Sequence, residues 1–518
     1  MSQLVVAPVL AALVTAVLTA LVRGRPRLRA GVSLAGGLGY LVAVAALFRA
    51  VAAEGRLTYQ LSAWQAPFGI SLVADALSTF MLGLAAVVAL AGVVFAVRSV
   101  DAFAQRLGFH PLYHLMLVGV SGAFLTGDLF NLFVWFEVML MASYVLVVLY
   151  GGPTQTRAAL VYVVLNLIGS ALMLVAIGGI YAVTGTLNLA DIARRLADPA
   201  AFGVDVAPVL GLSALLFTVF ALKAGLVPFH FWVPGAYRAA PAPVAAVLAG
   251  VVKKVGVYAV LRLYFTVFAA ATLPVSLPGI GGRSVLAFYG PVLVVLALAS
   301  IVVGGIAAVD RPDIDGLLAY SSVSQLGFVV LPLGVAAAVP ELRVLAITAT
   351  LVYTLNHGVA KALLFLVSGT LKDALGTDRF ADLGGLAARS PLLGGAFFVG
   401  ALSLVGVPPL IGFFGKLFVF DALGRAGADI ALAGALVGAL LTIAYASRAW
   451  NRAFWGPAPE AVEALELDRG LLAVVLALAA LVVLLGLGAE PVLRAAEAGA
   501  TAAVDRSGYV SAVLGGGA

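Results

Sequence analysis

Ionisable side chains stand inside long apolar segments of this 518-residue chain, where charge is costly. Glu137 lies far from either end of its apolar run, and Lys223, Lys254, Lys361 and Lys416 lie within or at the ends of others. A central charge costs about 2.5–3.5 kcal/mol even on the permissive insertion scale, so such groups must be paired, neutral or hydrated. A group that changes between a charged, paired form and a neutral form takes up or releases a proton. The residue types therefore favour ion translocation through a membrane.

Glu137 and Lys223 are the clearest candidates for a switchable ion pair. Burial disfavours the charged form of a lysine, and an adjacent carboxylate favours it. A proton that crosses a membrane potential of ~150–200 mV gains roughly 3.5–4.6 kcal/mol. A shift of ~3 units in the pKa of the lysine, caused by forming or breaking one ion pair, corresponds to a free energy of similar size. The hypothesis is charge switching at this pair. The alternative is a fixed ion pair that holds two helices together.

Two further groups could extend this chemistry. His357 and Lys361 are four residues apart and share one helix face. Histidine titrates near neutrality, so this face could relay protons, although a hydrogen-bonded core histidine is the alternative. Lys253 and Lys254 are adjacent, hence about 100° apart on a helix. At most one of them can point straight into a shared channel.

The elements that must hold these residues are transmembrane helices. The chain is 63% hydrophobic and 10% charged, with a mean hydropathy of +1.14, whereas a soluble domain carries about 25% charged residues. Apolar runs of about 18 or more residues recur along the chain, and each can cross a bilayer. The expected spans are 3–22, 31–51, 72–97, 111–127, 129–150, 158–184, 207–227, 241–268, 286–309, 314–335, 342–370, 391–423, 430–450 and 470–489.

Other residue types exclude several classes of site. The chain has no cysteine, which excludes disulfides, cysteine-bound iron–sulfur clusters and thiolate zinc sites within it. No cofactor is expected. His110 and His114 are four residues apart but have no nearby carboxylate, which makes a weak metal signal, and a hydrogen-bonding or proton-uptake role is preferred. Asp75 and Asp128 are expected to cap helices near the outer boundary. The basic residues sit mostly at span ends, as orientation signals do, and do not indicate nucleic acid.

Prolines interrupt two spans, the first within 223–235 and the second within 403–416, and each interruption has a lysine beside it. Proline removes a backbone donor and clashes with the preceding turn. Inside a bilayer, broken backbone is tolerated only where protein or a wet cavity satisfies it. Broken helices at matching positions of two halves are typical of inverted-repeat transporters and their ion sites. The alternative is that the prolines merely kink packed helices.

The predicted fold is an all-α integral membrane protein of about 14 transmembrane helices, with two inverted five-helix repeats that each contain a broken helix. The expected divisions are 1–110 for the first three helices, 111–268 for the first repeat, 286–452 for the second, and 453–518 for a loop and the fourteenth helix. Lysine and arginine are more frequent on the side of the arginine-rich loop 23–29. This bias predicts that both termini lie outside the cell.

The two halves are expected to be chemically unequal. The span 314–335, where the repeat would place a counterpart of Glu137, has Ser321, Ser322 and Gln325 but no acid in its middle. Lys416 would therefore be tuned without a matching glutamate.

Three segments carry a family resemblance: Pro228–Val244, Lys254–Tyr258 and Leu355–Leu366. They closely resemble the signatures of antiporter-like subunits, which occur in respiratory complex I, membrane-bound hydrogenases and multi-subunit Mrp cation/proton antiporters. The resemblance covers nearly the whole chain. Gly127–Leu140, the sequence Gly-Ala-Tyr from Gly235, and the short stretch after the last span look most like the Mrp D branch of the family.

The resemblance implies proton-translocating roles for six residues of this sequence, while Lys253 lies outside the matched pattern. They are Glu137, Lys223, Lys254, His357, Lys361 and Lys416. It also implies a non-enzymatic subunit of a hetero-oligomeric Na+/H+ antiporter in the cell membrane, with K+ or Li+ as further candidate ions. The alternative is a proton-pumping subunit of an NADH:quinone oxidoreductase or a hydrogenase. A structural scaffold with inert charges is a third hypothesis.

Overall fold

The chain is almost entirely helical. The computed structural model describes residues 2–272 and 284–515. In the first part the helices are α1 (Ala7–Leu21), α2 (Pro26–Glu54), α3 (Ala76–Ser99), α4 (Ala102–Arg106), α5 (Phe109–Leu125), α6 (Leu129–Val147), α7 (Pro153–Thr184), α8 (Leu189–Ala197), α9 (Pro199–Phe202), α10 (Val209–Ala224), α11 (Trp232–Ala239), α12 (Ala242–Val247) and α13 (Lys253–Val260). In the second they are α14 (Val285–Val309), α15 (Ile314–Ala338), α16 (Arg343–Leu375), α17 (Leu386–Arg389), α18 (Pro391–Val405), α19 (Ile411–Arg425), α20 (Asp429–Ala449), α21 (Glu460–Glu463), α22 (Arg469–Leu487), α23 (Ala489–Val504) and α24 (Arg506–Leu514).

The transmembrane prediction is confirmed. Over the described residues, ten helical stretches are long and apolar enough to cross a membrane, and four shorter apolar helices (α1, α5, α10 and α18) accompany them. Each of the expected spans overlaps one of these helices. The span expected at 241–268 is less regular than an ordinary helix, because π-helical turns η3 (Leu248–Val252) and η4 (Leu261–Val267) flank α13. Such turns frequently mark functional sites.

Both expected breaks are present. Helix α10 ends at Gly225, whose φ is +73°, and the chain resumes as α11. Helix α18 ends at Gly406, whose φ is +92°, before α19 begins. A left-handed residue after the last turn is the usual way to stop a helix, and glycine adopts it without strain. In the first break the free N–H of Val227 donates to Ser300 Oγ at 3.0 Å, so the interrupted backbone is satisfied by protein.

Two parts of the structure differ from the sequence prediction. Residues 72–74, expected at the start of the third span, belong to the strand β2 (Ser71–Ala74), which pairs antiparallel with β1 (Leu57–Gln60). Asp75 ends the strand because its carboxylate accepts the N–H of Ser78 at 3.0 Å and so starts α3. After the last expected span, α23 and α24 follow where no helix was predicted. Helix α23 is rich in alanine and carries charges, and it packs on α16 and α3.

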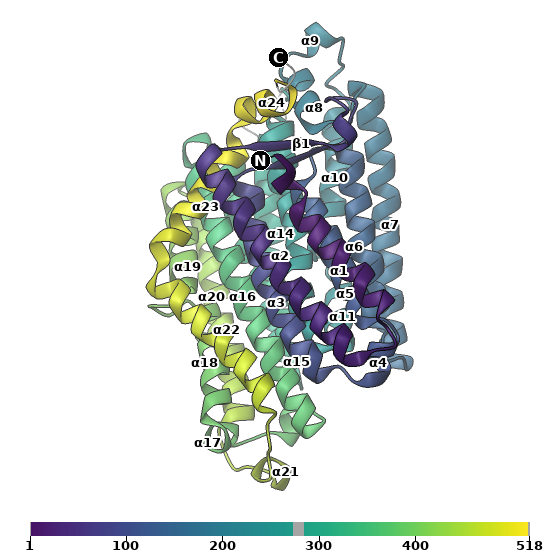
Figure 1. Ribbon diagram of the computed structural model, residues 1–518. Coiled ribbons are helices and arrows are strands. Elements are labelled where there is room, and N and C mark those ends of the chain that lie inside the picture. The colour runs from purple at the N-terminus through teal and green to yellow at the C-terminus, as the bar shows by residue number, and fades with distance from the viewer. Residues whose placement is uncertain (1, 273–283, 516–518) are drawn as a thin grey trace.

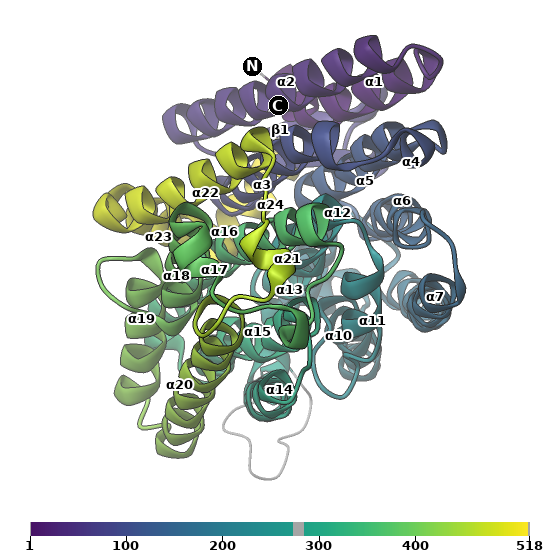
Figure 2. The ribbon, with the colours of Figure 1, turned by 90° about the horizontal axis from the view of Figure 1, so that it is seen from below.

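The long helices lie side by side, and short elements cover the two ends (Figure 1). We call the end with both chain termini, the hairpin and α24 the termini face, and the end with α4, α17 and α21 the opposite face. Seen along the bundle, α13, α15 and α16 lie in the middle, whereas α1, α2, α7 and α20 lie at the edge (Figure 2). The Arg23 side chain donates to the carbonyl of Arg106 at 2.6 Å, so the loops expected on one side are neighbours.

Candidate functional site

Glu137 and Lys223 meet through one serine. Glu137 is on α6, Lys223 in the last turn of α10 and Ser170 on α7. Lys223 Nζ lies 3.9 Å from Glu137 Oε1 and donates to Ser170 Oγ at 3.2 Å. The same hydroxyl donates a hydrogen bond to Glu137 Oε1. The expected neighbours therefore form an unbroken chain of donors from ammonium to carboxylate, in which Ser170 was not foreseen.

The surroundings of this pair are asymmetric. The Lys223 side chain is 2% exposed and that of Glu137 is 18% exposed. The ammonium lies 5.0 Å from the centroid of the Phe136 ring, whose face attracts cations. It also sits at the carboxyl end of α10, where unpaired carbonyls favour positive charge. The lysine thus has three separate sources of stabilisation for its charged form: the carboxylate, the aromatic ring and the end of the helix.

A second group of polar residues lies in the centre of the bundle. Lys253 Nζ donates to the carbonyl of Ser322 at 2.9 Å, and its distance to Ser322 Oγ is 3.3 Å. That hydroxyl lies 3.4 Å from His357 Nε2. One turn along α16, Lys361 donates to the carbonyl of Leu318 at 3.0 Å and to Ser321 Oγ. The serines of α15 therefore bring Lys253 together with the two residues of α16.

Lys254, beside this group, donates to backbone and not to the serines of α15. Its ammonium donates to the carbonyl of Ala249 in the preceding π-helical turn, and it is fully buried. Of the two adjacent lysines, Lys253 is the one that forms hydrogen bonds with α15. The family resemblance selected Lys254 and not Lys253, and helix periodicity did not indicate which side chain meets α15, because π-helical turns flank α13.

Lys416 has only neutral partners among the described residues. Its ammonium donates to the carbonyl of Val405 at 3.0 Å, at the end of α18. It lies 4.8 Å from the centroid of the Phe328 ring. Between this lysine and the central group, the amide of Gln325 donates to Tyr445 OH at 2.6 Å and accepts from Tyr353 OH. The second half thus uses hydroxyls and amides where the first half has a carboxylate.

The remaining polar candidates have mainly structural contacts. Ser33 Oγ joins the two histidines of α5, at 2.9 Å from His110 Nδ1 and 2.8 Å from His114 Nε2. Asp128 caps α6 by accepting the N–H of Asn131 at 2.7 Å. The structure brings neither histidine into contact with the lysine groups.

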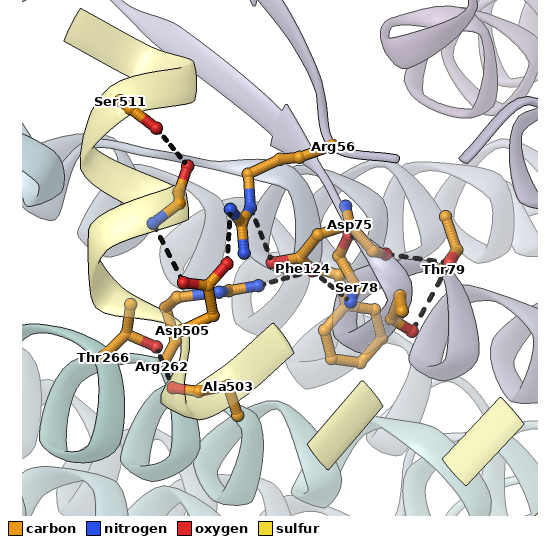
Figure 3. Close-up of polar contacts among 12 residues, drawn as sticks. Arg56, Asp75, Ser78, Thr79, Phe124, Arg262, Thr266, Ala503, Asp505 and Ser511 are labelled. Atoms are coloured by element: carbon orange, nitrogen blue, oxygen red, sulfur yellow. Dashed lines mark hydrogen bonds and ion pairs between the residues drawn. The ribbon is translucent and has the colours of Figure 1, made fainter. Parts of the chain in front are cut away.

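Asp75 belongs to a charged cluster near the termini face that the sequence did not reveal (Figure 3). Besides capping α3, it lies 2.7 Å from Arg262 Nη2 and 3.6 Å from Arg56 Nε. Arg56 also lies 3.4 Å from Asp505, just before α24. Both guanidinium groups stand over the Tyr509 ring. These residues come from four distant parts of the sequence, so no local pattern indicates their pairing.

Comparisons with known proteins agree with this arrangement. The family model for "NADH:quinone oxidoreductase/Mrp antiporter, TM" matches residues 126–442. The chain is 38% identical to the D-type subunit of the Na+/H+ antiporter of Alkalihalophilus pseudofirmus, over 89% of each chain. It is 33% identical to the protein of the same name from Bacillus subtilis, over 99% of this chain and 100% of that one.

A solved structure extends the comparison to three dimensions. A chain in the structure of the Mrp complex from a Dietzia species superposes with a TM-score of 0.85 at 30% identity, and 99% of each chain is covered. The match covers the helices that carry the lysine groups and both breaks. The chain therefore belongs to the NADH:quinone oxidoreductase/Mrp antiporter transmembrane family, and within it to the D-type antiporter subunits.

Proposed function

We propose that this chain is the proton-translocating subunit of a multi-subunit Na+/H+ antiporter and moves protons by switching the charge of Lys223 through its contact with Glu137. The observation that carries the proposal is the hydrogen-bonded chain Lys223–Ser170–Glu137. A buried ammonium held by a carboxylate is stable, and the same group without its partner favours the neutral amine. Forming and breaking this pair therefore drives uptake and release of one proton.

The proton released by Lys223 passes to the central group and then to Lys416. Lys253, Lys254, His357 and Lys361 provide titratable groups in the middle of the bundle; Ser322 joins Lys253 to His357, and Ser321 contacts Lys361. From there the proton route runs along the neutral hydroxyls that contact Gln325 and on to Lys416. Water molecules complete the steps between these groups. Each residue exchanges a proton without leaving its helix, so small side-chain movements are sufficient.

Sodium and the partner subunits belong to the same proposal. The relatives are named Na+/H+ antiporter subunits, and the similar solved chain is part of an Mrp complex. Among the described residues, the polar centre holds four cationic or titratable nitrogen side chains and no acid, so it repels a bare Na+ while it can exchange protons. We place the Na+ route in or beside the other subunits. The complex lies in the cell membrane, with both termini outside.

The test is cation-dependent proton flux in everted vesicles that contain the whole complex. Lys223→Ala and Glu137→Gln are expected to lower the initial flux by at least about tenfold while the complex still assembles. Arg425→Ala is the matched control, because it removes a positive charge that is 63% exposed and paired only with Asp421. Flux within about twofold of wild type in assembled Lys223→Ala complexes would support an inert scaffold instead.

The subunits that copurify with this chain distinguish an antiporter from the alternative, a redox-driven proton pump. A chain that pumps protons in an oxidoreductase would copurify with subunits rich in cysteine clusters, and its flux would require an electron donor. An antiporter chain copurifies with small membrane subunits, and addition of Na+ is enough to start its proton flux without an electron donor.

A further inference from the structure

Asp315 is a buried carboxylate near the opposite face, and the proton relay described above does not use it. It lies in the first turn of α15, and its side chain is 5% exposed. Lys372 Nζ lies 2.5 Å from Oδ2, and Ser368 Oγ donates to Oδ1 at 2.6 Å. The backbone N–H of Asp315 donates to the carboxylate of Asp378 at 2.9 Å. An acid, a lysine and a hydroxyl are thus held together just below the surface.

A polar cavity reaches this cluster from outside. It has a volume of about 450 Å³, and Gln155, Arg238 and Lys372 are among the residues that line it. Lys372 is 30% exposed, so it touches the cavity and the buried carboxylate at the same time. Beside it, in the loop that follows α16, burial and the neighbouring Asp315 carboxylate raise the pKa of Asp378 to about 6. An acid of that strength exchanges protons with water near neutral pH.

The same two helices lead from Asp315 to the central lysines. Ser321 lies six residues after Asp315 on α15, about 9 Å along the axis, and it holds the ammonium of Lys361. On α16, Ser368 is seven residues from Lys361, two turns along the same face.

We propose that Asp315 is the proton-transfer residue at the mouth of a half-channel that joins the opposite face to Lys361. Protons pass between the cavity and the carboxylate of Asp315, with Lys372 as its counter-charge. They then pass by water and Ser321 to the Lys361 amine. The inference rests on the proposed function, because it supplies the route by which the central lysines exchange protons with solvent.

Asp313 shows what a purely structural acid at this place does. It caps α15 by accepting the N–H of Gly316, and it forms two hydrogen bonds with Arg238, at 2.8 and 3.1 Å. Its carboxylate makes no hydrogen bond or ion pair with α16 among the described residues. Asp313 thus already supplies the cap and the negative charge that favour the start of a helix. A second acid is not needed for that purpose, and Asp315 faces the polar side of α16 instead.

Flux in everted vesicles with the whole complex tests the proposal. Asp315→Asn preserves the shape and one acceptor oxygen but cannot titrate, and it is expected to lower the initial flux by at least about tenfold. Asp315→Glu is expected to retain more than about a third of the flux, which a merely structural role would not require. Asp313→Asn is the matched control and should stay within about twofold of wild type.

Water access gives a readout that is independent of flux. Because the chain has no cysteine, Ser368→Cys places a single thiol beside Asp315. A small cationic methanethiosulfonate applied to the opposite face is expected to label it at least about tenfold faster than it labels Ser324→Cys. Ser324 is equally buried but donates to the Ile301 carbonyl, away from α16.

The outcomes are distinct. The half-channel is wrong if assembled Asp315→Asn complexes keep more than about half of the flux, if Asp313→Asn causes an equal loss, or if the two thiols react alike. Lys223→Ala is measured in the same vesicles. If it abolishes flux while Asp315→Asn does not, the proposed function stands and only the role of Asp315 fails.

Discussion

Lys223 and Lys416 are buried residues of the same type with different partners. Lys223 has a carboxylate within 3.9 Å, whereas Lys416 has a backbone carbonyl and an aromatic ring. A carbonyl and a ring stabilise positive charge but stay where the helices hold them. A glutamate side chain can turn away. Under the proposed function, rotation of the Glu137 side chain is enough to switch the charge of Lys223, whereas a switch at Lys416 requires movement of two helix ends.

Ser170 should control how strongly Glu137 acts on Lys223. Ser170→Ala leaves the ammonium and the carboxylate 3.9 Å apart, too far for a direct hydrogen bond. Loss of the bridge costs about 1–1.5 kcal/mol, so flux in everted vesicles is expected to fall about tenfold and not to vanish. Ser143→Ala is the control, because that buried hydroxyl on α6 contacts Tyr162 OH at 3.0 Å instead. Equal flux for both variants would show that the bridge is dispensable.

The sequence indicated the charged residues of the site better than their connections. A lysine or glutamate in an apolar span is conspicuous because its burial is costly, and the Glu137–Lys223 contact followed from that cost. A serine in a helix costs little, so nothing marked Ser170, and Ser321 and Ser322 were noted as polar residues without their lysine and histidine partners. The contact of Lys253 with α15 was not predicted, since the direction of each side chain depends on π-helical turns that no residue pattern predicted.

At the scale of elements, the two helix breaks were predictable from the sequence, whereas strand β2 and helix α23 were not. Proline pairs inside apolar spans signal a break directly. Strand β2, in contrast, is an apolar run continuous with α3, and only the Asp75 cap separates them. Helix α23 carries charges and small residues, so hydropathy gave no reason to place it beside α16. Such elements are fixed by long-range packing, which a single sequence does not display.

The second break depends on a close contact that only glycine allows. A Cβ on Gly412 would overlap the carbonyl oxygen of Ser403, in the last turn of the neighbouring half-helix α18. Gly412→Ala must push α19 away, at a cost of about 1–3 kcal/mol, and it moves Lys416 from the Val405 carbonyl. We expect a lower thermal unfolding midpoint and a loss of flux.

Gly424→Ala lies on the same helix and provides the comparison. No atom stands within 4 Å of the Cβ that it would add, and alanine favours helix more than glycine does by roughly 1 kcal/mol. Its midpoint should stay equal or rise, and its flux should stay near wild type. If Gly412→Ala behaved in the same way, the spacing of the two half-helices would not matter for transport.

At the scale of the whole molecule, charged clusters close both ends of an apolar bundle. The Asp75 cluster joins α3, the segment before the hairpin, η4 and the start of α24 (Figure 3). At the opposite face, Asp313 and Asp315 join α15 to α11 and α16. Polar side chains pair helices in the middle of the bundle, and these clusters add charged contacts between helices at its two ends.

The Asp75 cluster should therefore be a structural element and not part of the proton route. Asp75→Asn leaves Arg262, which is 2% exposed, without its closest carboxylate. Removal of one partner from a buried pair costs about 3–5 kcal/mol, so the thermal unfolding midpoint of the purified complex should fall clearly. Asp421→Asn breaks an exposed pair and should change stability by less than about 1 kcal/mol. Flux per assembled Asp75→Asn complex should remain near wild type at low temperature. An unchanged midpoint with abolished flux would instead place Asp75 in the proton route and give the termini face its own titrating acid.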